Sequence, residues 1–203
     1  MKKNILLALV ISVLLLTSCT SMQVSINRNF DFSKIKRIAV MQFDDYPGAT
    51  DSGKQVADLF IGGLLNIGVS VIERMQMNQL LAEQKLSLSG YIDPNQVKEV
   101  GKMLSADALL LGTVSQYTQA SQSTQEVTTV ETNRRGDLYD VSQPYTYLTP
   151  AQVSISCKLV SVETGEVIFA ASGSYDGSTP AIAAQSLVES MADDIAQQIN
   201  KKK

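Results

Sequence analysis

The sequence predicts an α/β fold in which helices pack on a mixed β-sheet. Three apolar runs, at residues 37–43, 69–72 and 108–114, have the length and composition of buried strands. Apolar residues at helical spacing separate these runs and give the order β-α-β-α-α-β, which is typical of a layered unit. Two alternating strands and an amphipathic helix follow, so we expect a C-terminal β-hairpin and a final helix packed on the same sheet.

The first 18 residues have the pattern of an export signal. Two lysines precede an apolar run over residues 5–16, which is too short to span a bilayer as a helix. Leu16-Thr17-Ser18-Cys19 then places a leucine, two small residues and a cysteine at the cleavage point, as in the bacterial lipobox. We therefore predict a signal peptide at residues 1–18 and lipidation of Cys19. A plain secreted protein and an uncleaved anchor are the alternatives.

The lipobox also bears on the compartment. In such lipoproteins the cysteine carries diacylglycerol and an N-acyl chain, and an Asp directly after it favours retention in the inner membrane. Thr20 follows Cys19 here and favours the outer membrane, with the folded part in the periplasm. We expect no cofactor beyond these acyl chains. Residues 19–34 are polar and weakly patterned, which predicts a lipidated tether with room for a short edge segment at its end.

The composition excludes several classes of function. Removal of the two signal lysines from the 17 basic residues leaves 15 against 20 acidic ones, so the chain offers no electrostatic surface for nucleic acid. It has no His, the commonest general base and metal ligand. Cys157 alternates with Val153, Ile155 and Leu159 on the apolar side of one strand, which predicts a buried structural thiol. We therefore expect neither an enzyme nor a metal site.

Helix signals lie between the first predicted strands. Thr50 or Asp51 is expected to cap the first helix, and Gly68 to end it. Residues 75–85 predict a second helix. Asp93, followed by proline, predicts the start of a third. These helices supply the outer layers of the expected unit.

The second half of the chain changes character. Residues 115–150 form a polar insertion rich in Ser, Thr and Gln, with two arginines at its expected tip. Apolar residues do not alternate there as a strand in lipid requires, so we expect a hairpin in water. Residues 151–162 and 166–172 predict two strands joined by a tight turn, in which Gly165 takes the left-handed position. A helix over residues 179–201 follows.

One motif resembles a nucleotide-binding loop but lacks part of its ligand set. Gly48-Ala49-Thr50-Asp51-Ser52-Gly53-Lys54 fits G-x-x-x-x-G-K, but Gln55 replaces the hydroxyl that would hold Mg²⁺. We expect a surface loop with a helix cap, and no nucleotide.

Asp44 and Asp45 point to opposite sides of an extended chain and cannot act as a pair. Glu73-Arg74 suits a local ion pair at a helix start.

Three segments together resemble the CsgG family of curli assembly and transport lipoproteins. They are Glu73–Gly90 (ERMQMNQLLAEQKLSLSG), Ala106–Gly112 (ADALLLG) and Val162–Val167 (VETGEV). The first is the most specific. The resemblance implies a CsgG-like α/β domain over residues 35–203. In pore-forming members of the family each subunit supplies two membrane hairpins, and the insertion at 115–150 lies at the place of the first.

The resemblance further implies an envelope lipoprotein, often assembled into rings. After Ser172 the chain passes almost directly into the last helix, which leaves no room for a second membrane hairpin. We therefore expect an outer-membrane lipoprotein that binds envelope proteins or copies of itself and supports envelope assembly or export. The alternatives are a subunit of an oligomeric secretion channel of the curli type and a lipoprotein activator of a peptidoglycan synthase, a class with a related fold.

Overall fold

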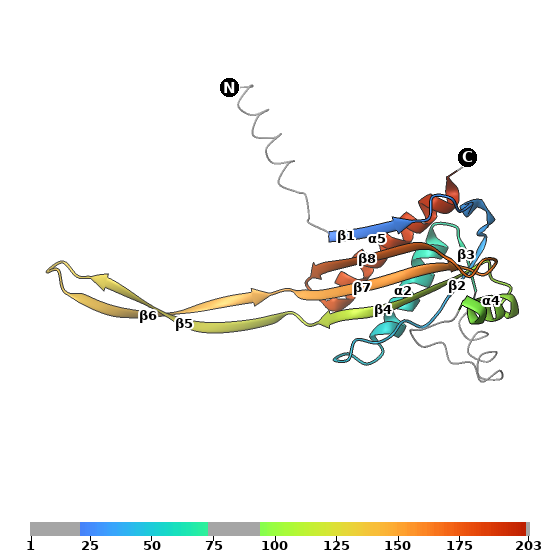
Figure 1. Ribbon diagram of the computed structural model, residues 1–203. Helices are drawn as coiled ribbons and strands as arrows, with labels where there is room; N and C mark the ends of the chain where they lie inside the picture. The colour runs from blue at the N-terminus through green and yellow to red at the C-terminus, as the bar shows by residue number, and fades with distance from the viewer. Residues whose placement is uncertain (1–20, 73–93, 202–203) are drawn as a thin grey trace, which may run out of the picture.

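The structure is a computed structural model that describes residues 21–72 and 94–201. Its main sheet has six strands in the order β1-β8-β7-β4-β2-β3 (Figure 1). β2 pairs in parallel with β3 and β4, and the remaining neighbours are antiparallel, which confirms the predicted mixed sheet. In sheet order the strands are β1 (Ser21–Ile26), β8 (Val167–Gly177), β7 (Ala151–Ser161), β4 (Ala108–Thr118), β2 (Arg37–Val40) and β3 (Ser70–Ile72).

Helices cover both faces of this sheet. α2 (Ser52–Asn66) and α5 (Pro180–Asn200) pack together on one face, while α4 (Pro94–Met103) packs on the other. Successive residues of a strand point to opposite faces, so Leu110 of β4 belongs to the core under α2 and α5 and Leu109 to the core under α4. The predicted α/β layering is therefore confirmed.

The ends of several elements follow the predicted signals. Thr179 caps α5, and its hydroxyl accepts a hydrogen bond from the Ile182 amide at 3.3 Å. Gly165 has φ +76° in the β7–β8 turn, the left-handed conformation predicted for it. The helix expected at residues 75–85, the cap at Asp93 and the Glu73-Arg74 pair lie outside the described residues.

The predicted tether is shorter than expected. Residues 21–26 form β1, an edge strand that pairs with β8 from Ser21 opposite Ser174 to Ile26 opposite Phe169. Met22 and Ile26 pack against the core. The alternation of these side chains with polar ones stabilises a strand, although the segment is polar on average. A 3₁₀-helix η1 (Phe32–Lys34) then leads into β2.

The predicted polar insertion is a long β-hairpin. β4 and β7 lead into β5 (Ser121–Thr132) and β6 (Leu138–Thr149), which form a separate two-stranded sheet projecting from the domain (Figure 1). The turn between them contains the two predicted arginines and Gly136, at φ +90°. Every residue of β5 is exposed, and so is every residue of β6 except Val141, which is half-buried.

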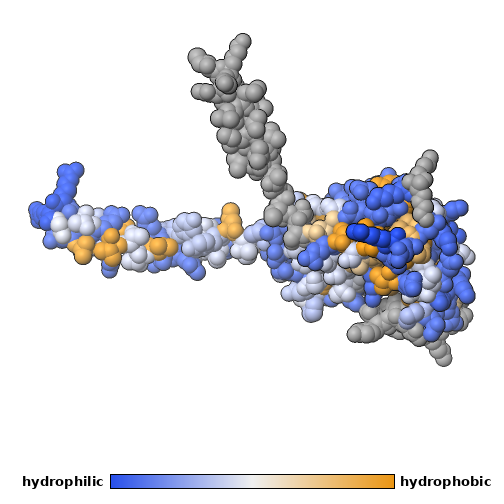
Figure 2. Space-filling model, turned by 45° about the horizontal axis from the view of Figure 1, so that its top comes forward, coloured by the Kyte–Doolittle hydropathy of each residue, from blue (hydrophilic) through white to orange (hydrophobic). Residues whose placement is uncertain are grey.

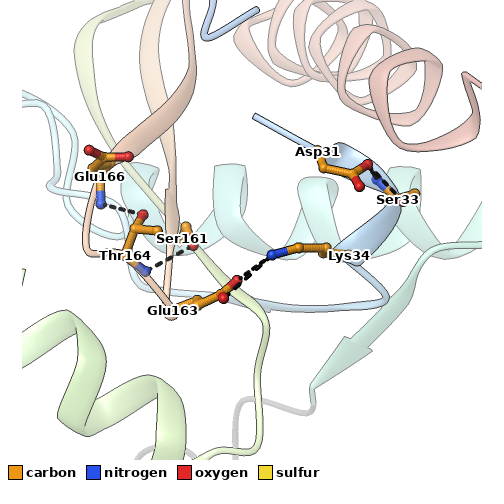
Figure 3. Close-up of polar contacts among 7 residues, drawn as sticks. All are labelled: Asp31, Ser33, Lys34, Ser161, Glu163, Thr164 and Glu166. Atoms are coloured by element: carbon orange, nitrogen blue, oxygen red, sulfur yellow. Dashed lines mark hydrogen bonds and ion pairs between the residues drawn. The ribbon is translucent and has the colours of Figure 1, made fainter. Parts of the chain in front are cut away.

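A cluster of polar contacts closes the opposite end of the sheet, where η1 meets the β7–β8 turn (Figure 3). The Lys34 ammonium lies 3.1 Å from a Glu163 carboxylate oxygen. Within the turn, the Thr164 amide donates to the Ser161 hydroxyl at 3.3 Å. Both charged side chains are more than half exposed, so the ion pair contributes under about 1 kcal/mol. Within the same turn the Gly165 amide donates to the Ser161 carbonyl at 2.8 Å.

Candidate functional site

The hairpin β5–β6 is the largest exposed feature that the fold presents. Cross-strand register places Tyr139, Tyr145 and Tyr147 on one face together with Val127 and Val141. The Tyr145 and Tyr147 rings lie 4.6 Å apart between centroids, and the Tyr139 hydroxyl donates to Glu131 at 3.1 Å. Figure 2 shows separate hydrophobic patches on the otherwise mostly hydrophilic hairpin. Aromatic side chains among Thr, Ser and Gln suit contact with another protein.

The chain enters the sheet at the end from which the hairpin projects (Figure 1). Ser21 pairs with Ser174 of β8, and three residues later Gly177 pairs with Ala151 at the base of the hairpin. Cys19, the predicted lipidation site, lies outside the described residues, but it precedes Ser21 by only two positions. A lipid at Cys19 would therefore hold this end of the domain close to a membrane.

A shallow polar hollow lies on the part of the sheet that α4 leaves uncovered. It encloses about 360 Å³ and is lined mainly by short or polar side chains of β1, β8, β7 and β4, with Asp44 and Lys158 as its charged groups. Neighbouring polar side chains bond to each other across strands: the Ser154 hydroxyl donates to Ser174 at 3.1 Å and the Gln152 amide to Asp176 at 2.9 Å. These bonds satisfy four side chains that lie outside the lining of the hollow.

The loop that resembles a nucleotide-binding motif is filled by the protein itself. Asp45 accepts hydrogen bonds from the Gly53 amide at 2.7 Å and from the Asp51 amide at 3.1 Å. Asp51 occupies the cap position of α2, as predicted, but it has φ +63° and its side chain makes no capping bond. Asp45 supplies that bond from the preceding loop. Asp44 instead accepts from the Thr113 hydroxyl, so the two acids serve different partners, as predicted.

We expect Mg-ATP not to bind at Lys54. The Asp45 carboxylate occupies the amides at the start of α2 that would receive a phosphate, and its charge would repel one. Calorimetry of the full-length protein in detergent should therefore show no heat of binding. Micromolar affinity that disappears in Lys54→Ala would contradict this.

Cys157 is buried, as predicted, with 4% of its surface exposed. Its sulfur faces α5 and lies 3.9 Å from the Met191 sulfur. Burial raises the pKa of the Cys157 thiol to about 12, although a backbone hydrogen bond with Ala171 acts in the opposite direction. Because the thiolate is the nucleophile, we expect this cysteine to be unreactive in the folded protein at neutral pH.

We expect folded protein to react with a thiol reagent at least 100-fold more slowly at Cys157 than protein unfolded in urea. The reason is the combination of burial and a raised pKa of the Cys157 thiol.

Raising the pH through 9 should destabilise the fold, because the unfolded thiol ionises there while the folded thiol stays neutral until about pH 12. Rapid labelling of native protein would show that this part of the core opens readily.

Within residues 21–72 and 94–201, no three His, Cys, Asp or Glu side chains lie close enough together to hold a metal ion. No helix in the same ranges is both long and apolar enough to cross a membrane.

The feature that sequence reasoning missed is the capping role of Asp45. A local pattern does not reveal it, because this acid lies six residues before the helix cap.

Comparisons with solved structures identify the fold. The PelC dodecamer from Paraburkholderia phytofirmans superposes with a TM-score of 0.51 at 14% identity, covering 91% of this chain and 100% of that one. Lipoprotein GNA1162 from Neisseria meningitidis superposes with a TM-score of 0.50 at 17% identity, covering 79% of this chain and 98% of that one. At these identities the likeness shows a shared fold. No curated protein sequence matches significantly.

A family comparison gives a closer relationship. Residues 17–190 match the family described as "Curli production assembly/transport component CsgG". The match contains all three segments that carry the resemblance, although the structure describes only those at 106–112 and 162–167. Because it spans most of the sequence, the chain belongs to the CsgG family.

Proposed function

We propose that this protein is a lipid-anchored accessory of envelope assembly or export, which acts by binding other proteins rather than by catalysis. Cys19 carries the diacylglycerol and N-acyl chain, Thr20 directs the protein to the outer membrane, and the α/β domain lies in the periplasm. Membership of the CsgG family supports a role in assembly or transport. The oligomeric state of PelC, which shares the fold, supports a protein that also binds copies of itself.

The observation that carries the proposal is the exposed hairpin. Twelve-residue strands project from a domain whose own core is complete without them, and they expose tyrosines and valines to solvent. Such an arm adds nothing to the core, so its use lies in contact with something else. Its position at the end where the chain enters the sheet places that contact near the anchor.

The competing function is a subunit of a secretion channel of the curli type. Membership of the CsgG family and the place of the hairpin in the chain are in its favour. Against it stand Glu126 and Glu131 within β5, because a charged side chain on the lipid-facing side destabilises a barrel strand. The chain also runs from Gly177 at the end of β8 to Pro180 at the start of α5, without a second hairpin.

We expect purified lipidated protein to show no ion conductance in planar bilayers. A variant lacking residues 119–146 should keep its fold by circular dichroism and its outer-membrane fraction in sucrose gradients, because β4 and β7 pair independently of the hairpin. The same deletion should lose the envelope proteins that cross-link to the wild type. Conductance that depends on residues 119–146 would establish the channel instead.

A further inference from the structure

The hairpin β5–β6 has two unpaired edges. Its strands pair only with each other in the described structure, from Ser121 opposite Thr149 to Thr132 opposite Leu138. A two-stranded ribbon of this kind is marginally stable in water and gains from a third strand. It also leaves apolar side chains in solvent, with Val127 exposed by 40% and Val130 by 62%. A partner strand could add to the β5 edge or to the β6 edge, depending on the backbone groups that each exposes.

The turn fixes which backbone groups face outward. The Asn133 amide donates to the Asp137 carbonyl at 3.0 Å, so the amide of this odd-numbered residue points at β6. Amides alternate in direction along an antiparallel strand, so the odd-numbered residues of β5 bond to β6 and the even-numbered ones point away from it. The same alternation on β6 turns the nitrogens of its even-numbered residues outward, including that of Pro144, which lies opposite Glu126.

The two edges therefore differ. Proline has no amide hydrogen, so Pro144 interrupts the row of donors in the middle of the β6 edge. β5 contains no Pro, Gly, Lys or Arg, and half of its residues are Thr or Val, which favour strands. Natural proteins block strand edges with proline and positive charges, and here only the β6 edge is blocked by proline. The β5 edge is complete over twelve residues.

We propose that the β5 edge is a homodimer interface, in which β5 pairs antiparallel with β5 of a second copy around a two-fold axis at Val127. This deepens the proposed protein-binding role by naming one partner and one surface. The result is a four-stranded sheet in the order β6-β5-β5-β6. Both outer edges are then β6 edges blocked by Pro144, so the pairing ends at two chains.

The register suits a second copy. Centred on Val127, it places each Val127 against the partner's Val127 in a pair whose side chains approach closely. Glu126 lies opposite the partner's Thr128, and Thr124 opposite the partner's Val130. No glutamate lies directly opposite another glutamate, an arrangement that would be destabilising. The β-branched side chains of both copies thus meet on both faces of the new sheet.

The same geometry disfavours a head-to-tail arrangement of hairpins. If β5 of one copy paired with β6 of the next, Pro144 would lie inside a continuous sheet, where its missing donor leaves a gap in the hydrogen-bond ladder. Repetition around a closed ring would place one such gap at every junction. Pairing of β5 with β5 keeps every proline at an outer edge.

Two proline variants of the full-length lipidated protein in detergent test the interface by sedimentation. Thr128→Pro removes an outward amide from β5, whereas Ser142→Pro, its cross-strand partner, removes one from the edge already blocked. Both lose the same hydroxyl–hydroxyl bond of 3.0 Å, so they are matched in their effect on the hairpin. We expect dimeric wild type, a dimer constant weakened at least 100-fold in Thr128→Pro, and unchanged dimer in Ser142→Pro. Monomeric wild type, or equal effects of the two variants, would overturn the proposal.

A cysteine pair identifies the strands in contact. Val127→Cys should form cross-linked dimers under mild oxidation, because the two side chains face each other across the axis. Gln143 lies opposite Val127 on β6, so Gln143→Cys should not cross-link to itself. Wild type, with Cys157 buried, is the control. Cross-links between Val127→Cys and Gln143→Cys copies would show head-to-tail pairing and overturn the proposal. These outcomes do not depend on lipidation or on envelope partners, so they separate failure of the interface from failure of the proposed function.

Discussion

Replacement of Gly53 by alanine is expected to destabilise the protein by about 3 kcal/mol, which lowers Tm by roughly 6–12 °C in a domain of this size. A methyl group at Gly53 would lie 2.0 Å from the Phe43 carbonyl oxygen and 2.7 Å from its carbon. Both are backbone atoms of the buried segment that follows β2 and cannot move aside as a side chain does. The first turn of α2 would have to shift, and the Asp45 bond to the Gly53 amide would lengthen.

Gly62→Ala in the same helix is the matched control. Apart from the adjoining residues and backbone of its own helix, nothing lies within 4 Å of a methyl group at Gly62, so only the conformational effect remains. Alanine is favoured over glycine inside a helix by up to about 1 kcal/mol, and Gly62→Ala should therefore be as stable as wild type or more so. Urea unfolding followed by circular dichroism measures both. If the two variants lose equal stability, close packing at Gly53 is not the reason for its glycine.

Gly53 has a different role here from the one that its sequence pattern suggests. In G-x-x-x-x-G-K the second glycine permits a backbone to approach a phosphate. Here Gly53 permits the helix to approach Phe43, and Asp45 takes the place of an anion at the helix start. The pattern correctly predicted a tight connection between a strand and a helix. It could not reveal what the tight connection accommodates, because that depends on atoms eight to ten residues earlier in the chain.

The strands and helices with strong periodicity were predictable, and the weakly apolar ones were less so. The buried strand at 108–114 and the helix from Thr179 follow directly from apolar spacing and capping residues. The polar average composition of residues 19–34 favours a tether, although Met22, Val24 and Ile26 of β1 alternate strictly with polar residues. An edge strand needs only one apolar face, so period is a better guide than average hydropathy there. The blocked β6 edge follows only from register, which no local pattern supplies.

Cys19→Ala is expected to abolish attachment to the membrane. If the wild type carries the predicted acyl chains at Cys19, each buried methylene group contributes about 0.8 kcal/mol, and attachment through more than one chain is stable where a single chain is marginal. The short connection between Cys19 and β1 adds a consequence for the position of the hairpin. Only Thr20 separates Cys19 from the first residue of β1, so an anchor at Cys19 would hold the edge of the folded sheet itself, at the end that carries the hairpin. Without it the acidic domain has no attraction to an anionic lipid surface.

Metabolic labelling with a fatty acid, followed by separation of membrane and soluble fractions, measures this change. Wild type should be labelled and sediment with the outer membrane, whereas Cys19→Ala should be unlabelled and lose the membrane fraction almost completely. Cys157→Ala is the matched control, because it removes the other cysteine of the chain and should be labelled and fractionate as wild type. A Cys19→Ala protein that is still labelled and still membrane-bound would mean that the anchor lies elsewhere. The short connection between Cys19 and β1 would then have no bearing on how the hairpin is presented.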